Sequence, residues 1–228
     1  MNTTTTRSLS LCALASATLL AFASPARAGA LSYVLPMDAD PSADGWTLQT
    51  SGGAHAVGGG ILSIDTPGFR QFDAPMAIWD DTVSNADGWS AEARLRLFPS
   101  FTTDTRVQMW LMDDVNFNKL EVYQDRVELR SGFITMSYSM DTTSAFHIYE
   151  VVAQGTNTKL FVDGVEQISI DWVTSAAATF TMNFGDGHGS HPSDSQWDYV
   201  AIRHNAIPAP GAAALMTIAF GCLTRRRR

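Results

Sequence analysis

Two nearby stretches of the chain, residues 106–112 and 119–123, alternate apolar residues with aromatic and polar ones. If each forms a β-strand, the aromatic and polar side chains share the face that points away from the core. Sugar sites combine aromatic rings, which pack on the apolar side of a pyranose, with polar groups that bind its hydroxyls. The spacing therefore predicts a carbohydrate-binding face made of Trp110, Tyr123, Gln108, Glu121 and Lys119.

Charged residues alternate with apolar ones in two further stretches. In residues 89–97, Glu92, Arg94 and Arg96 point away from the apolar positions, and Arg130 does so in residues 126–130. We expect these residues, Arg94 above all, to join the same face. The alternative is that the two aromatic residues of this face are ordinary cross-strand packing residues, which are common in sheets.

Paired carboxylates are the other chemistry that this region could support. A retaining glycosidase needs two carboxylates about 5–5.5 Å apart, one as nucleophile and one as acid/base. Glu121 and Asp125 share a face of a strand but lie four residues apart, and in a regular strand Glu128 faces the other side. The sequence therefore predicts no catalytic pair, and we assign no catalytic residue.

The elements that must position these residues are strands. Short alternating segments separated by Gly, Asp and Asn indicate an all-β sandwich or barrel. Asp163-Gly164 is typical of the tight turn of a hairpin. The expected strands are 89–97, 106–112, 119–123, 126–130, 147–152, 159–162, 165–170, a set around Phe180, Met182 and Phe184, and 199–202.

The two ends of the chain differ from its middle. Arg7, the apolar residues 9–22 and Ala26-Arg27-Ala28 form the pattern of a secretory signal peptide, residues 1–28. Residues 29–206 have a length that suits one domain. This part contains all 23 acidic residues but nine of the 15 basic ones, a net charge of −14. Such a charge disfavours nucleic acid and anionic lipid, and it is compatible with calcium and neutral polysaccharides.

The last residues, 207–228, join Ile207-Pro208-Ala209-Pro210 to an apolar run and then to four arginines. This order resembles the PEP-CTERM sorting tail of exported bacterial proteins. The resemblance implies cleavage by a membrane-embedded exosortase and delivery to the cell surface or extracellular matrix. The apolar run is shorter than the roughly 20 residues of a spanning helix, which fits a transient membrane association.

Several segments of the middle region occur in a familiar order. Leu160-Phe161-Val162-Asp163-Gly164 comes before Phe184-Gly185-Asp186, and Trp197-Asp198-Tyr199-Val200 follows. This order resembles the concanavalin A-like, or laminin-G-like, jelly-roll superfamily over residues 31–204. The resemblance implies two curved antiparallel sheets and a concave face that often holds carbohydrate.

Glucanases of this superfamily supply two further expectations. They carry catalytic glutamates on one strand, and by resemblance Lys119 and Tyr123 stand at those two positions here, so the catalytic pair is missing. They also bind a structural calcium. By resemblance its ligands here are the Asp198 carboxylate and the carbonyl of Gly60.

Three functions remain open. The first, which we favour, is an exported lectin-like module that binds carbohydrate or matrix polysaccharide at the cell surface. The second is a glycoside hydrolase of the laminarinase/lichenase type. The third is a structural matrix or surface protein. The expected partners are a polysaccharide and the sorting protease.

Overall fold

The computed structural model describes residues 31–66, 68–100, 104–171, 181–187 and 193–205. The predicted signal peptide, residues 1–28, and the predicted sorting tail, residues 207–228, lie outside this part. Among the described residues, no helix has both the length and the hydropathy needed to cross a membrane.

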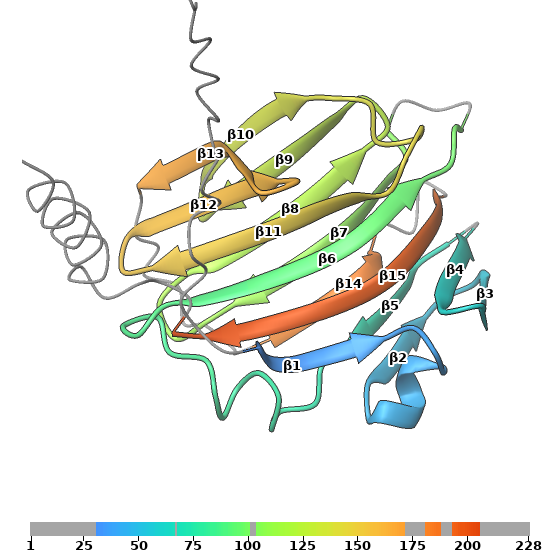
Figure 1. Ribbon diagram of the computed structural model, residues 1–228, viewed down its shortest axis with the longest axis horizontal. Helices are drawn as coiled ribbons and strands as arrows, with labels where there is room; N and C mark the ends of the chain where they lie inside the picture. Colours follow the sequence, from blue (N-terminus) through green and yellow to red (C-terminus); the bar gives the residue numbers. More distant parts are fainter. Residues whose placement is uncertain (1–30, 67, 101–103, 172–180, 188–192, 206–228) are drawn as a thin grey trace, which may run out of the picture.

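The chain folds into two antiparallel sheets that lie face to face (Figure 1). Sheet A consists of eight strands in the order β13 (Val165–Asp171), β12 (Asn157–Val162), β11 (His147–Gln154), β6 (Trp89–Leu97), β15 (Ser193–His204), β4 (Ile61–Thr66) and β3 (Ala54–Gly58), with β1 (Leu31–Pro36) also paired to β15. Sheet B consists of seven strands in the order β10 (Ile134–Ser139), β9 (Arg126–Ser131), β8 (Phe117–Tyr123), β7 (Arg106–Met112), β14 (Thr181–Asp186), β5 (Arg70–Asp73) and β2 (Thr47–Thr50). One 3-10 turn, η1 (Pro41–Asp44), precedes β2. The all-β sandwich expected from the alternation is confirmed.

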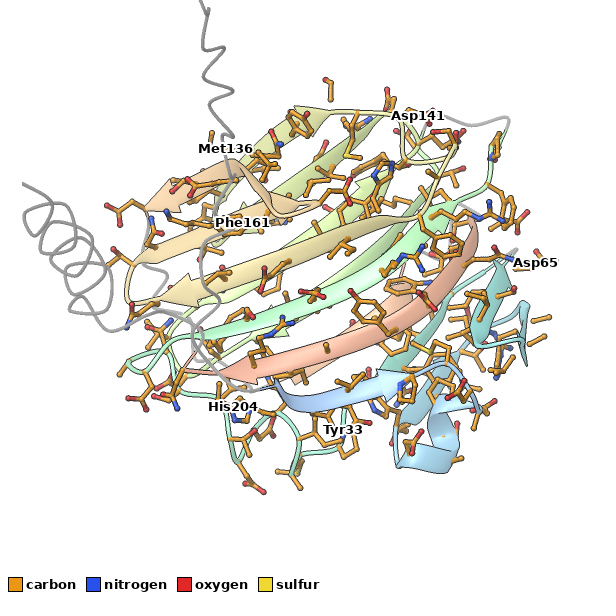
Figure 2. The ribbon with its side chains drawn as sticks, viewed as in Figure 1. Tyr33, Asp65, Met136, Asp141, Phe161 and His204 are labelled. Carbon is orange, nitrogen blue, oxygen red and sulfur yellow. The ribbon has the colours of Figure 1, made fainter. Side chains whose placement is uncertain are left out.

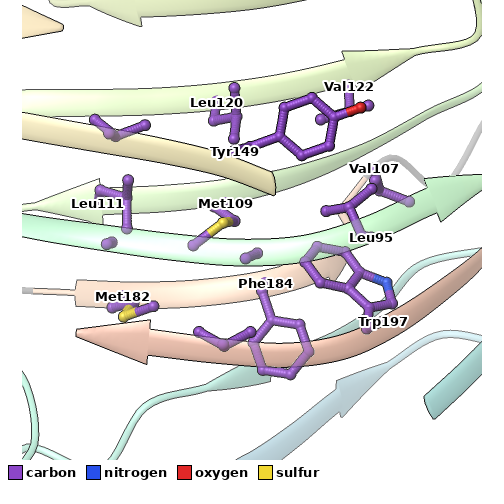
Figure 3. Close-up of a cluster of buried hydrophobic side chains, with 14 of the residues drawn as sticks. Leu95, Val107, Met109, Leu111, Leu120, Val122, Tyr149, Met182, Phe184 and Trp197 are labelled. Carbon is purple, nitrogen blue, oxygen red and sulfur yellow. The ribbon is translucent and has the colours of Figure 1, made fainter. Parts of the chain in front are cut away.

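The core lies between the sheets, and both contribute to it through alternate residues. Figure 3 shows Leu95, Tyr149 and Trp197 of sheet A against side chains of β7, β8 and β14 of sheet B. Each large side chain that is fully buried here stabilises the fold by about 1.5–3 kcal/mol. Because these residues alternate with the predicted site residues, the packing of the core fixes which side chains point outward.

Candidate functional site

The outer face of sheet B carries most of the predicted site residues. Val107, Met109 and Leu120 are buried in the core, so their neighbours in sequence point away from it. We call this surface the sheet B face. It is built by outward side chains of β5, β14, β7, β8 and β9, among them Asp73, Asn183, Arg106, Gln108, Trp110, Phe117, Lys119, Glu121, Tyr123, Arg126, Glu128 and Arg130.

Strand pairing orders these side chains in rows across the sheet. In one row, Asn183 lies opposite Trp110, Trp110 opposite Lys119, and Lys119 opposite Arg130. In the next row, Gln108 lies opposite Glu121. Five predicted residues, Trp110, Tyr123, Gln108, Glu121 and Lys119, are therefore brought together on one face of the adjacent strands β7 and β8. Their role in binding stays a prediction.

Several polar side chains of this face are buried although they point outward. Asn183 is 5% exposed and Glu121 is 8% exposed. Gln108 is covered by its own chain, because a Cβ atom placed on Gly187 would lie 1.3 Å from its Nε2 atom. The side chain of Gln108 therefore lies directly beneath the backbone at Gly187 and contacts it.

A network of charges joins the middle of the face. Lys119 Nζ donates to Glu121 Oε1 at 2.8 Å, and Arg106 Nε lies 3.0 Å from the same oxygen. Arg106 also donates to the Tyr123 hydroxyl at 3.0 Å. Burial raises the pKa of Tyr123, and the charge of Glu121 raises it further, so this phenol stays protonated at neutral pH. Glu121 thus lies within ion-pair distance of both Lys119 and Arg106.

The aromatic rings lie under cations. Lys119 Nζ lies 5.2 Å from the centre of the Trp110 ring, and Arg126 lies 3.8 Å from that of Tyr123. Phe117 meets Trp110 edge to face at 5.2 Å and lies 5.6 Å from the Arg130 guanidinium. These distances are typical of cation–π contacts.

Apart from Arg106 Nε, which lies 3.0 Å from Glu121 Oε1, one buried donor and one buried acceptor of the face have no hydrogen-bond partner among the described residues. They are Trp110 Nε1 and Asn183 Oδ1, which belong to directly opposed residues of β7 and β14. Asn183 uses its amide to hydrogen-bond Asp73, its neighbour on β5. Buried polar groups are almost always paired, so an unpaired donor beside an unpaired acceptor marks a place where a ligand group would be stabilised.

Arg94 does not join the sheet B face, and that expectation was wrong. It lies on β6 in sheet A. The outer faces of the two sheets are on opposite sides of the sandwich, so Arg94 lies far from the sheet B face. The same holds for Glu92 and Arg96. Strand phase fixes inward or outward orientation, but it does not say to which sheet a strand belongs. Arg94 instead forms an ion pair with Asp198 and lies 4.9 Å from the ring of Phe146.

The expected orientation of Glu128 was also wrong. Strands β8 and β9 form a hairpin across Gln124 and Asp125, so the chain reverses and Glu128 lies directly opposite Glu121 on the same face. A single regular strand would have placed the two on opposite faces. The Arg126 guanidinium donates to Glu128 at 2.7 Å. The face thus holds two neighbouring carboxylates, each paired with a basic side chain.

The two predicted calcium ligands lie near one segment of the chain. The Asp198 carbonyl accepts a hydrogen bond from Met37 at 3.4 Å, and Asp38 Oδ1 lies 3.5 Å from where a Cβ atom on Gly60 would be. The Asp198 carboxylate, however, is bound by Arg94. The described residues contain no group of three or more His, Cys, Asp or Glu side chains that could hold a metal ion.

Sequence reasoning missed several members of the sheet B face. Phe117 lies two residues before the predicted start of β8, so extending the alternation would have found it. Asn183 stands between the apolar residues 182 and 184, which already implied that it points outward. Asp73 gave no signal, since its place depends on the pairing of β5 with β14.

No protein-family model matches this chain, and no curated protein matches it significantly in sequence. Solved structures do match. A laminarinase from Flavobacterium sp. UMI-01 has a TM-score of 0.57 and 12% identity, over 77% of this chain and 100% of that one. The potassium-bound carbohydrate recognition domain of Emp46p has a TM-score of 0.56 and 14% identity, over 77% and 98%.

An endo-β-1,3-glucanase from Pyrococcus furiosus matches with a TM-score of 0.57 and 12% identity, over 77% of this chain and 94% of that one. A sialidase also matches, with a TM-score of 0.53 and 10% identity, but the chain covers 16% of its length. At these identities the likeness concerns the backbone. What the chain shares with lectin domains and glycoside hydrolases alike is their fold, the concanavalin A-like jelly roll.

Proposed function

We propose that this protein is a carbohydrate-binding module, and that the sheet B face holds the sugar. The observation that carries the proposal is the unpaired Trp110 Nε1 donor beside the unpaired Asn183 Oδ1 acceptor. A sugar hydroxyl both donates and accepts, which suits a place that combines an unpaired donor with an unpaired acceptor. The rings of Trp110 and Phe117, 5.2 Å apart, supply apolar contact next to it. The lectin and glucanase folds that the chain resembles support this use of the scaffold.

Binding without hydrolysis fits the residues at the catalytic positions of the glucanase fold. By resemblance those positions hold Lys119 and Tyr123, neither of which is a carboxylate. The remaining acid, Glu121, is fixed between Lys119 and Arg106. An acid/base must be free to reach the substrate, whereas the Glu121 carboxylate is engaged by two basic side chains of the protein.

The test is a glycan array with the purified protein, run with calcium and with chelator, followed by titration of the polysaccharide that binds. Trp110→Ala removes both the unpaired donor and its ring. We therefore expect binding to weaken by about tenfold or more, a loss of about 1.4 kcal/mol in binding free energy. Phe161→Ala is the matched control, because it removes an aromatic ring from the outer face of sheet A (Figure 2).

Equal affinity of the Trp110 variant and the wild-type protein would remove the sheet B face from the proposal. Binding of no glycan by a well-folded sample would favour the third function, a structural matrix or surface protein.

One observation favours hydrolysis as a second candidate. Glu121 and Glu128 lie directly opposite each other on β8 and β9, where Cβ atoms are about 4.5–5.5 Å apart. Retaining glycosidases hold two carboxyl groups about 5–5.5 Å apart, so this opposed pair is the candidate for such a role. Incubation with the bound polysaccharide, followed by an assay for new reducing ends, tests it. Reducing ends formed by the wild-type protein, and absent with both Glu121→Gln and Glu128→Gln, would make it an enzyme.

We further propose that residues 29–206 are the mature domain and that it is exported and sorted to the cell surface. The support is the sequence of both ends, the signal-peptide pattern of 1–28 and the PEP-CTERM-like tail of 207–228. Mass spectrometry of the protein recovered from the cell surface gives its two termini. An N-terminus at Gly29 and loss of the arginine cluster are expected. An intact tail would argue against exosortase processing.

A structural calcium at Gly60 and Asp198 is a separate part of the proposal. Both residues lie beside the chain at Met37 and Asp38, whose carbonyl and carboxylate oxygens are suitable calcium ligands. Arg94 opposes it, because a calcium ion must displace that guanidinium from the Asp198 carboxylate. The metal-bound lectin of the same fold carried potassium.

A further inference from the structure

The basic residues of this acidic protein are concentrated on the sheet B face. Four of the nine in residues 29–206, Arg106, Lys119, Arg126 and Arg130, point outward from the adjacent strands β7, β8 and β9. The acids that point outward from the same strands are Glu121 and Glu128. This patch, the outward side chains of β7, β8 and β9, therefore carries a charge of +2. Asp73 on β5 lowers the charge of the sheet B face to +1, while the rest of residues 29–206 carries −15. The total charge of the chain conceals this local reversal of sign.

The cations also change what the aromatic rings offer to a ligand. Lys119 lies over Trp110, Arg126 over Tyr123, and Arg130 over Phe117. A neutral pyranose packs best on an uncovered ring face. A cation lies over each of these rings, so a ligand on this face meets positive charge as well as apolar ring surface.

Arg130 is the member of the patch best placed for an external anion. It is exposed, and its Nε donates to the Gly132 carbonyl at 2.9 Å. Among the described residues it forms no ion pair with a carboxylate, unlike Arg106, Lys119 and Arg126. The outer edge of an arginine guanidinium matches the two oxygens of a carboxylate or sulfate.

Arg130 also lies in the same row as the two unpaired atoms. The order across the sheet is Asn183, Trp110, Lys119 and Arg130. Neighbouring strands are about 4.8 Å apart, so this row extends about 14 Å, the length of a short oligosaccharide. A site for a hydroxyl at one end is thus followed by two cations on neighbouring strands.

We propose that the ligand of the sheet B face is an acidic polysaccharide, which places a hydroxyl at Trp110 and Asn183 and a carboxylate or sulfate at Lys119 and Arg130. This inference rests on the proposed carbohydrate-binding function and names the class of its ligand. Elsewhere the negative surface repels a polyanion, which confines the polymer to this face and fixes its orientation.

Titrations with polygalacturonate, dextran sulfate and uncharged dextran at two salt concentrations test the proposal. We expect one of the polyanions to bind at least tenfold more tightly than dextran, and more weakly at high salt. The two polyanions distinguish a carboxylate from a sulfate ligand. Arg130→Gln is expected to weaken polyanion binding at least fivefold, and Lys119→Gln provides a second variant in the same row.

Lys159→Gln is the matched control, because it removes one positive charge from β12 on the other sheet. Equal losses in Lys159→Gln and Arg130→Gln would show diffuse attraction and overturn the inference. Binding of neutral glycans with equal affinity and no salt dependence would overturn it while leaving the carbohydrate-binding function intact. Failure of folded protein to bind any polysaccharide, charged or neutral, would overturn both.

Discussion

Asp194 on β15 lies directly opposite Asp65 on β4, and the two carboxyl groups share a hydrogen bond. Burial raises the pKa of Asp194, and the charge of Asp65 raises it further. The folded protein therefore binds this proton more tightly than the unfolded chain does. The free energy of unfolding therefore increases as pH falls through the raised pKa of Asp194. Above that pKa the two like charges destabilise the sheet.

Asp194→Asn should stabilise the protein at neutral pH. Like charges directly opposite across strands cost up to about 1 kcal/mol, which corresponds to roughly 2–4 °C in melting temperature for a domain of this size. The gain should shrink as pH falls through the raised pKa, because the wild-type carboxyl then becomes protonated. Thermal melts across pH measure this. Asp87→Asn removes one exposed acid elsewhere, and an equal gain there would show a general effect of net charge instead.

Asp113, in the loop after β7, should contribute strongly to stability. Its fully buried carboxylate accepts hydrogen bonds from Trp89 Nε1 at 2.8 Å, Asn85 Nδ2 at 2.9 Å and the Val115 amide at 2.8 Å. Asp113→Ala leaves these donors buried and unpaired, each at a cost of about 1–3 kcal/mol. Urea denaturation should show a loss of about 3 kcal/mol or more.

The neighbouring Asp114 is the control for that variant. It is exposed and accepts one hydrogen bond, from the backbone N–H of Asn85 at 3.2 Å. Asp114→Ala should therefore cost about 1 kcal/mol or less. Comparable losses for the two variants would mean that the buried network around Asp113 contributes little.

Much of the fold follows from local sequence, because its central strands are amphipathic. The predicted bounds of β6 and β7, residues 89–97 and 106–112, agree with the structure. Strands β1, β2, β3, β5 and β10 were not predicted. The alternation of Ile134, Met136 and Tyr138 in β10 was overlooked. β2 is short and largely exposed, and β1 forms through its pairing with β15 at the other end of the domain. Such strands depend on long-range pairing that a local pattern does not contain.

The candidate site shows the same limit at the level of single residues. Alternation placed Trp110, Lys119 and Tyr123 on one outward face, since inward and outward positions are a local property of a strand. Arg94 and Glu128 were misplaced because their positions depend on sheet membership and on a hairpin turn. The pairing of Trp110 with Asn183, more than 70 residues away, required the structure.

Calcium gives a prediction that depends on Asp198 in two ways. Asp198→Ala should lower the melting temperature in the absence of calcium, because it breaks the ion pair with Arg94. If calcium binds here, it raises the melting temperature of the wild-type protein and not of the variant. Melts with calcium chloride and with chelator measure both effects. An equal calcium-dependent shift in the two proteins would exclude Asp198 as a ligand.

The outer face of sheet A offers the last prediction, through Arg203. Its guanidinium lies between Glu92 and Glu150, which are opposed on β6 and β11, with NH1 at 2.9 Å and 3.3 Å from their oxygens. All three residues are buried. Breaking a buried ion pair by removing one partner typically costs about 3–5 kcal/mol, since the remaining charge is left uncompensated.

We therefore expect Arg203→Met to lower the free energy of unfolding by this amount, measured in urea. Adding Glu150→Gln should restore part of it, because the second buried charge is then gone. Arg96→Met is the control, since Arg96 hydrogen-bonds the uncharged Gln196 and should cost about 1 kcal/mol. A similar cost for Arg203→Met and Arg96→Met, with no recovery in the double variant, would show that the three charges are compensated by other groups.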